Sequence, residues 1–109
     1  FGALADGALV GILGVGLATK VKRLHRAELF GTFVADEARR TGVARALMDH
    51  ALEYARGTGA KVVVCEVAHA AAGARALYES YGFEVYGTDA FSLQVGGEML
   101  AADMLVRRL

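Results

Sequence analysis

Residues 38–47 read ARRTGVARAL, and they mark the point where a strand-like pattern changes to a helical one. After Gly42, apolar side chains recur at helical spacing, at Val43, Leu47, Ala51 and Ala55. Charged side chains occupy the opposite side of the same stretch, which is typical of an amphipathic helix. The pattern ends at GTG, residues 57–59, a common glycine signal for the end of a helix.

Strand patterns flank this predicted helix on both sides. Residues 28–35, ELFGTFVA, predict one strand, with Gly31 as a bulge or a point of close backbone approach. Residues 61–67, KVVVCEV, are rich in β-branched side chains, as expected of a strand covered on both faces. A strand, a helix and a strand in this order predict a βαβ unit with parallel strands and a right-handed crossover.

The rest of the chain adds strands and one shorter helix. Residues 1–17 predict a hairpin around Asp6-Gly7, a pair that favours a tight turn with positive φ. Residues 20–26 predict a basic loop, residues 72–81 a helix that stops at Gly82, and residues 83–86 a strand. Residues 91–106 predict a final hairpin around Gly96-Gly97. We therefore expect a single α/β domain over residues 1–109, with a mixed sheet and a central βαβ unit.

Composition excludes several classes of function. The 109 residues carry a formal net charge of +0, which gives no bulk attraction to nucleic acid or to an anionic membrane. Cys65 is the only cysteine, so an internal disulfide is impossible, and we expect a buried thiol and a cytoplasmic, reducing compartment. The histidines at positions 25, 50 and 69 show no metal-ligand spacing, so no metal is expected. His69 is kept as an alternative to the glutamates considered below for the role of a base.

The turn before the predicted helix is either an anion seat or a plain connection with solvated arginines. The first N–H groups of a helix lack partners within it and carry partial positive charge, which suits an anion. Gly42 would allow close approach to the backbone, and Thr41 would act as N-cap or donate its hydroxyl. The residues of this seat are Arg39, Arg40, Thr41, Gly42, Val43, Ala44 and Arg45. The glycine patterns of dinucleotide and nucleoside-triphosphate loops are missing.

Two motifs decide between these interpretations. Residues 39–44 fit R-x-x-G-x-A, which resembles the acyl-CoA signature of the GCN5-related N-acetyltransferase (GNAT) superfamily. Residues 74–83, ARALYESYGF, resemble the second signature of that superfamily, A-x-x-L-Y-E-x-x-G-F. The resemblance covers nearly the whole chain and implies the GNAT fold, with the turn cradling the pyrophosphate of acetyl-CoA.

The resemblance also implies roles for individual residues. Thr32, Phe33 and Val34 would offer backbone groups to the pantetheine arm, and Tyr78 would protonate the departing thiolate. Glu66 resembles the base of the ribosomal-protein N-terminal acetyltransferases, and Glu28 that of the histone acetyltransferases. The implied activity is transfer of an acetyl group from acetyl-CoA to an acceptor, the primary amine of a small molecule, a protein N-terminus or a lysine. The alternatives are a non-catalytic acyl-CoA-binding or regulatory domain and a structural module.

The chain departs from the family pattern in places. Asp36 replaces a frequent proline, Arg40 replaces a frequent glycine, and Ala71 stands where many members have an asparagine that binds the CoA arm. The family begins with a strand and two helices that have no counterpart before Phe1, so we expect an N-terminally incomplete domain. An apolar strand would then be exposed, and we expect it to pair two chains into a homodimer.

Overall fold

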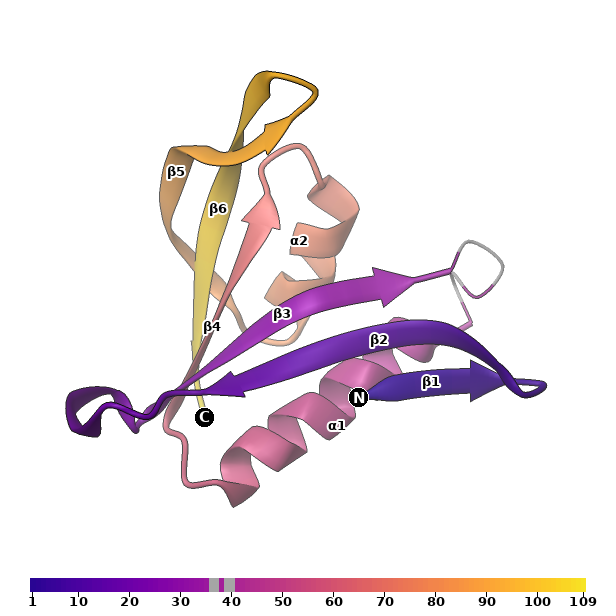
Figure 1. The fold of residues 1–109 in the computed structure, drawn as a ribbon. Coiled ribbons are helices and arrows are strands. Elements are labelled where there is room, and N and C mark those ends of the chain that lie inside the picture. Colours follow the sequence, from indigo (N-terminus) through magenta and orange to yellow (C-terminus); the bar gives the residue numbers. More distant parts are fainter. Residues whose placement is uncertain (36–37, 39–40) are drawn as a thin grey trace. The chain divides into compact units, whose positions relative to one another are not determined.

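The structure is a computed structural model that describes residues 1–35, 38 and 41–109 (Figure 1). The described elements follow the order β1 (Gly2–Ala5), β2 (Ala8–Leu17), a 3-10 turn η1 (Val21–Arg23), β3 (Arg26–Val34), α1 (Val43–Gly57), β4 (Val62–Ala68), α2 (Ala72–Ser80), β5 (Glu84–Val95) and β6 (Glu98–Arg108). They form two compact units, residues 1–63 with Leu109 and residues 64–108, so that the boundary falls inside β4. The predicted mixed α/β class is confirmed.

In the first unit, β1, β2 and β3 are neighbours in that order and antiparallel. The turn between β1 and β2 has φ of 51° at Asp6 and 80° at Gly7. Both central residues therefore have the positive φ that a tight hairpin turn requires, and the predicted hairpin is confirmed.

A bulge interrupts β3 at the predicted glycine. Gly14 pairs with Phe30 and Ile12 pairs with Phe33, so β3 has one more residue than β2 between these pairs. Gly31 takes a φ of 63° within this extra segment. A left-handed glycine inside a two-against-one pairing is the geometry of a β-bulge, which confirms the prediction for Gly31.

Helix α1 packs against the strands of the same unit through the predicted apolar face. Its buried residues are Leu47, Met48, Ala51, Leu52 and Ala55. The helix lies so close to β2 that a Cβ built on Gly11 would be 2.8 Å from Val43 Cγ1 and 3.1 Å from Leu47 Cδ1. Gly11 therefore sets how closely the first turns of α1 approach the sheet.

Both helices end as the glycines predict. At α1, the N–H of Ala60 donates to the carbonyl of Ala55 and that of Gly59 to Arg56, at 3.3 and 3.0 Å. Gly59 has a φ of 85°. These bonds form a Schellman motif, which satisfies carbonyls that the helix itself leaves open.

In the second unit, the strand order is β4-β6-β5, with β5 and β6 antiparallel around the predicted turn at Gly96 and Gly97. The core of this unit contains Cys65, Val67, Tyr78, Phe83 and Leu105. The structure joins the predicted strand 83–86 and the first arm of the predicted hairpin into one strand, β5. Register shifts after Val85 and Asp89 let the strand continue through a stretch without regular alternation.

The described helices are short. No α-helix in the ranges 1–35 and 41–109 is both long and apolar enough to cross a membrane.

We predict opposite effects for alanine at two glycines near or in α1. Gly11→Ala forces its Cβ against Val43, and overpacking of this kind costs about 1–3 kcal/mol. Gly57→Ala meets nothing within 4 Å and lies at the last turn of the helix, so it should be neutral or stabilise by up to about 1 kcal/mol. Thermal unfolding of both variants measures this difference. Equal melting temperatures would contradict a close contact at Gly11.

Candidate active site

The start of α1 is open to a ligand. The N-cap residue is Gly42, with φ 88° and ψ 3°, and no side chain in the described part of the chain makes a cap hydrogen bond there. A Cβ built on Gly42 would have nothing within 4 Å, so the space above this backbone is empty of described protein atoms. Unpaired N–H groups and the helix dipole give such an end the character of an anion site.

Thr41 does not have the predicted capping role. Its hydroxyl donates to the carbonyl of Ala38 instead, and Gly42 occupies the N-cap position. The threonine closes the short turn before the helix, and its left-handed neighbour then redirects the chain. Of the two roles considered for Thr41, N-cap or hydroxyl donor to an oxygen, the first is wrong, and the oxygen that accepts from the hydroxyl is a carbonyl of the chain itself.

The other residues of the predicted seat are in part described. Val43 and Ala44 are half-buried in the first turn of α1, while Arg45 is exposed on the surface of the helix. Arg39 and Arg40 lie outside the described residues, as does Asp36. The described part of the seat thus consists of Thr41, a glycine cap, two small or apolar side chains and one arginine.

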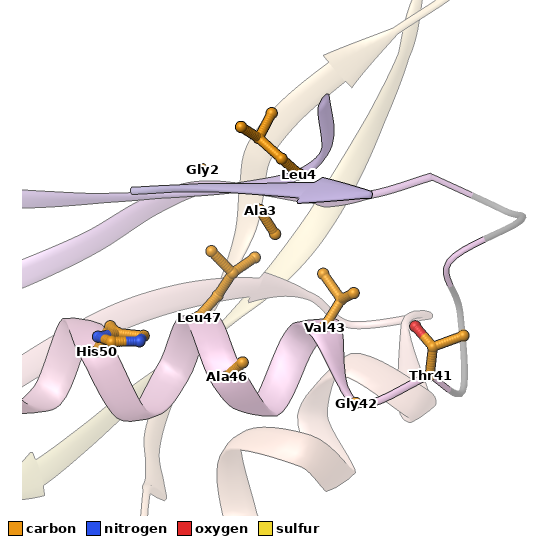
Figure 2. Close-up of a pocket in the computed structure, with 9 residues that line it drawn as sticks. All are labelled: Gly2, Ala3, Leu4, Thr41, Gly42, Val43, Ala46, Leu47 and His50. Carbon is orange, nitrogen blue, oxygen red and sulfur yellow. The ribbon is translucent and has the colours of Figure 1, made fainter. Parts of the chain in front are cut away.

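A pocket of about 350 Å³ adjoins this helix start, on the side that faces β1 (Figure 2). Figure 2 shows Ala3 of β1 and Leu47 of α1 pointing toward each other across it. The pocket is lined by Gly2, Ala3, Leu4, Thr41, Gly42, Val43, Ala46, Leu47 and His50. Most of these side chains are small or apolar, so the pocket itself provides space and apolar contacts. The positive charge that would attract an anion must therefore come from the N-terminus of α1.

Strand β3 carries the predicted pantetheine contacts and one predicted base. Thr32 and Phe33 are exposed and Val34 is half-buried, directly after the bulge at Gly31. Phe33 and Val34 pair with Ile12 and Gly11 of β2. Glu28 is exposed, and it alternates with the buried Ala27 and Leu29. Its carboxylate therefore lies on the sheet face opposite to those two side chains.

The second unit holds the other two predicted catalytic residues. Glu66 is exposed on β4, and its Oε2 accepts a hydrogen bond from Ser92 Oγ at 2.9 Å. Tyr78 is buried on α2, and its ring meets that of Phe83 edge-on, with centroids 5.5 Å apart. The structure thus gives Glu66 a fixed partner and Tyr78 a packing role beside any chemical one.

A polar cluster in the second unit joins four elements. Asp103 of β6 has only 4% of its side-chain surface exposed. Its Oδ1 lies 2.9 Å from Nδ1 of His69, which follows β4, and 2.8 Å from Oγ1 of Thr88 on β5. Its Oδ2 accepts from Nη1 of Arg75 on α2 at 2.9 Å. Every oxygen of this buried carboxylate is therefore hydrogen-bonded.

The cluster holds Asp103 ionised. The hydrogen bond from His69, then that from Thr88 and that from Arg75, lower the pKa of the Asp103 carboxyl below its ordinary value of 3.8, against the opposing effect of burial. Donors directed at the charged form favour it over the neutral acid. Near neutral pH the second unit therefore contains a buried negative charge directed at an imidazole.

A model of the family described as Acetyltransferase (GNAT) family matches residues 1–83. The match includes both the open helix start at Gly42 and the α2 segment that carries Tyr78. The chain belongs to the GNAT family.

Individual relatives agree with this assignment. The chain is 39% identical to human N-acetyltransferase 8 over 69 residues, which are 63% of this chain and 30% of that protein. A ribosomal-protein-alanine N-acetyltransferase from Brucella melitensis is 29% identical, with a TM-score of 0.89 over 99% of this chain and 67% of the other. A probable acetyltransferase from Staphylococcus epidermidis, at 24% identity, shares the fold with a TM-score of 0.89, over 98% of this chain and 65% of the other. The chain therefore spans about a third of the curated relative and about two thirds of these solved GNAT structures.

Sequence reasoning named His69 but missed the residues that hold it. Asp103, Arg75 and Thr88 lie 34, 6 and 19 positions from His69 in the chain, and only the fold brings them together. One signal was available in the sequence: an aspartate within the apolar run AADMLV, residues 101–106. A charged residue in a strand that is otherwise apolar requires partners, because an unpaired buried charge is costly.

We predict that Asp103→Asn lowers stability at neutral pH and loses this effect in acid. A carboxyl whose pKa is lowered by folding stabilises the protein above its unfolded pKa, and that stabilisation is lost as the pH falls through the folded pKa. The melting temperatures of wild type and variant should differ by several degrees near pH 7 and converge below about pH 3.8, the ordinary value. Asp6→Asn, in the exposed hairpin turn, makes the same charge change and is the control. A gap that stays constant with pH would contradict the lowered pKa.

Proposed function

We propose that this chain carries an acetyl-CoA-dependent N-acetyltransferase activity toward a primary amine. The glycine-capped start of α1 is the observation that carries the proposal, because within residues 1–35, 38 and 41–109 no side chain caps these helix N–H groups and the space at Gly42 is open. Family membership supports acetyl-CoA as the ligand, and its pyrophosphate is then the anion that binds at residues 39–45. Thr32, Phe33 and Val34 then serve the pantetheine arm.

The reaction sets definite chemical demands. An alkyl ammonium has a pKa near 10.4 and an α-ammonium near 7.7–8.0, so a base must remove a proton before nitrogen can attack the thioester carbonyl. The C–N bond forms, the C–S bond breaks, and the thiolate must gain a proton as it leaves. We assign that last proton to the Tyr78 hydroxyl, and Glu66 and Glu28 are the two carboxylates proposed as base from the family resemblance.

The acceptor is a primary amine of a small molecule, a protein N-terminus or a lysine. The solved relative from Brucella melitensis is named for alanine of a ribosomal protein, which supports an α-amine as the first acceptor class to test. A non-catalytic acyl-CoA-binding domain is the second candidate. Ala71 favours it, because this N-cap of α2 offers no side-chain hydrogen bond where family members use an asparagine to hold the CoA arm.

We predict that a negative charge at the start of α1 weakens cofactor binding. Calorimetric titration with acetyl-CoA should show binding to the wild type and a loss of about tenfold or more in Gly42→Asp, equivalent to about 1.4 kcal/mol or more. Gly59→Asp is the matched control, since Gly59 has a similar φ of 85° but lies past the other end of the helix.

The control separates repulsion from strain. Both aspartates occupy a left-handed backbone position with nothing within 4 Å of the added Cβ, so both variants share the conformational cost. Equal affinity of the two variants for acetyl-CoA would show that acetyl-CoA does not bind at the N-terminus of α1. No binding by the wild type would overturn the proposed function itself.

We predict that Tyr78→Phe reduces turnover and spares binding. The substitution removes the hydroxyl and keeps the ring that packs on Phe83, so the Kd for acetyl-CoA should not change, and thermal unfolding checks that the variant is folded. Loss of a general acid typically lowers kcat by about 10²- to 10⁴-fold. Tyr81→Phe, at the end of the same helix, is the control. Wild-type turnover in Tyr78→Phe would mean that this tyrosine serves only packing.

A further inference from the structure

His69 is fixed through its backbone as well as its ring. It lies in the turn between β4 and α2, and its N–H donates to the carbonyl of Ala101 at 2.9 Å. Its own carbonyl accepts from Arg75 Nη1 at 3.0 Å. The residue is thus tied to β6 and to α2 before the imidazole makes any contact, which restricts where the ring can point.

The ring contact determines which nitrogen is available for chemistry. Nδ1 lies 2.9 Å from Oδ1 of Asp103. An ionised carboxylate can only accept hydrogen bonds, so Nδ1 carries the proton in the neutral ring. The lone pair then belongs to Nε2, and the side chain is 64% exposed. The cluster therefore presents an oriented proton acceptor to solvent.

The Asp103 carboxylate is itself held in place by the other residues of the cluster. Two carboxylates, Asp103 and Glu79, face one guanidinium: Arg75 Nη1 lies 2.9 Å from Asp103 Oδ2, and Arg75 Nε lies 3.6 Å from Glu79 Oε1. Thr88 adds a neutral donor. The carboxylate that contacts Nδ1 of His69 is therefore held by partners on α2 and β5, which keeps the orientation of the ring fixed as well.

We propose that Nε2 of His69 is the general base that deprotonates the amine acceptor, and that Asp103 is a positioning residue that fixes the tautomer. This inference rests on the proposed acetyl transfer. His69 takes one proton from the ammonium, and the freed nitrogen lone pair forms the C–N bond to the thioester carbonyl. As the C–S bond breaks, the thiolate takes the proton of Tyr78, and the second proton of the amine nitrogen restores the phenol. The proton on His69 returns to solvent.

Two comparisons favour His69 over the carboxylates. A general base works best when its pKa lies near the working pH. The ordinary pKa of an imidazole is closer to neutral pH than that of a carboxyl group. In addition, His69 is oriented by a nearly buried partner, whereas Glu66 is exposed on β4 with a hydrogen bond from Ser92, and Glu28 is exposed on β3.

The decisive variant is His69→Asn. The asparagine amide can donate to Asp103 from the place of Nδ1, but it has no counterpart of Nε2, so the cluster is kept while the base is removed. Glu66→Gln and Glu28→Gln are the matched comparisons for the rival bases. For each protein, kcat/KM is measured across pH with a saturating concentration of acetyl-CoA, together with the Kd for acetyl-CoA and the melting temperature.

The expected result is specific to His69. His69→Asn should lower kcat/KM near pH 7 by about 10²- to 10⁴-fold and remove the acidic limb of the pH profile, with the Kd for acetyl-CoA unchanged. Glu66→Gln and Glu28→Gln should keep that limb. Added imidazole should restore activity to His69→Ala and not to Tyr78→Phe. A wild-type profile in His69→Asn, or loss of the limb in a glutamine variant instead, would overturn the proposal.

One measurement tests the inference without any acetyl transfer, so that it can be separated from the proposed function. Nitrogen NMR of the wild-type chain, with His69 assigned by comparison with His69→Asn, shows which ring nitrogen carries the proton at neutral pH. A proton on Nδ1 in the wild type supports the oriented base, and a proton on Nε2 overturns it. If the wild type binds acetyl-CoA but acetylates no amine, the proposed function fails, and this tautomer result still stands.

Discussion

The close approach of α1 to β2 at Gly11 is the constraint on which the first unit depends. A Cβ at this position would collide with Val43, so the first turn of the helix can lie against the strand only because the side chain is missing. The helix begins directly after Gly42, whose left-handed conformation makes it the N-cap. Two glycines thus act at this N-terminus: Gly11 allows the close packing, and Gly42 caps the helix without a side chain of its own.

Local pattern made most of the fold predictable. The hairpin at Asp6-Gly7, the bulge at Gly31 and the glycine stops of both helices each depend on residues that are neighbours in the chain. The failures arose where two local solutions compete. A threonine before a helix can cap it or close the turn before it, and here the hydroxyl reaches the carbonyl of Ala38. The strand after α2 continues past its irregular stretch because pairing with β6 compensates for the lost alternation.

The polar cluster around Asp103 lies beyond such reasoning because it depends on long-range pairing. Asp103 reaches His69 across 34 positions and Thr88 across 15. Whether His69 is a surface histidine or an oriented one depends on the register of β6, since Ala101 fixes its backbone and Asp103, two residues further along the same strand, holds its ring. A slip of one residue would turn the aspartate to the other face of the sheet and separate the pair.

The second family signature has a physical meaning that differs from its chemical one. In the stretch from Tyr78 to Phe83, the N–H of Phe83 donates to the carbonyl of Tyr78 and that of Gly82 to Glu79, while the two rings meet edge-on. These are the bonds and the apolar contact of a Schellman motif, with the left-handed position that glycine fills most easily. Glu79 adds an ion pair to Arg75. Helix termination therefore explains Tyr78, Gly82 and Phe83, three of the six named places of the signature, so a match to it reports the fold as well as the chemistry. His69 and Asp103, the residues of the further proposal, lie outside this signature, which covers residues 74–83.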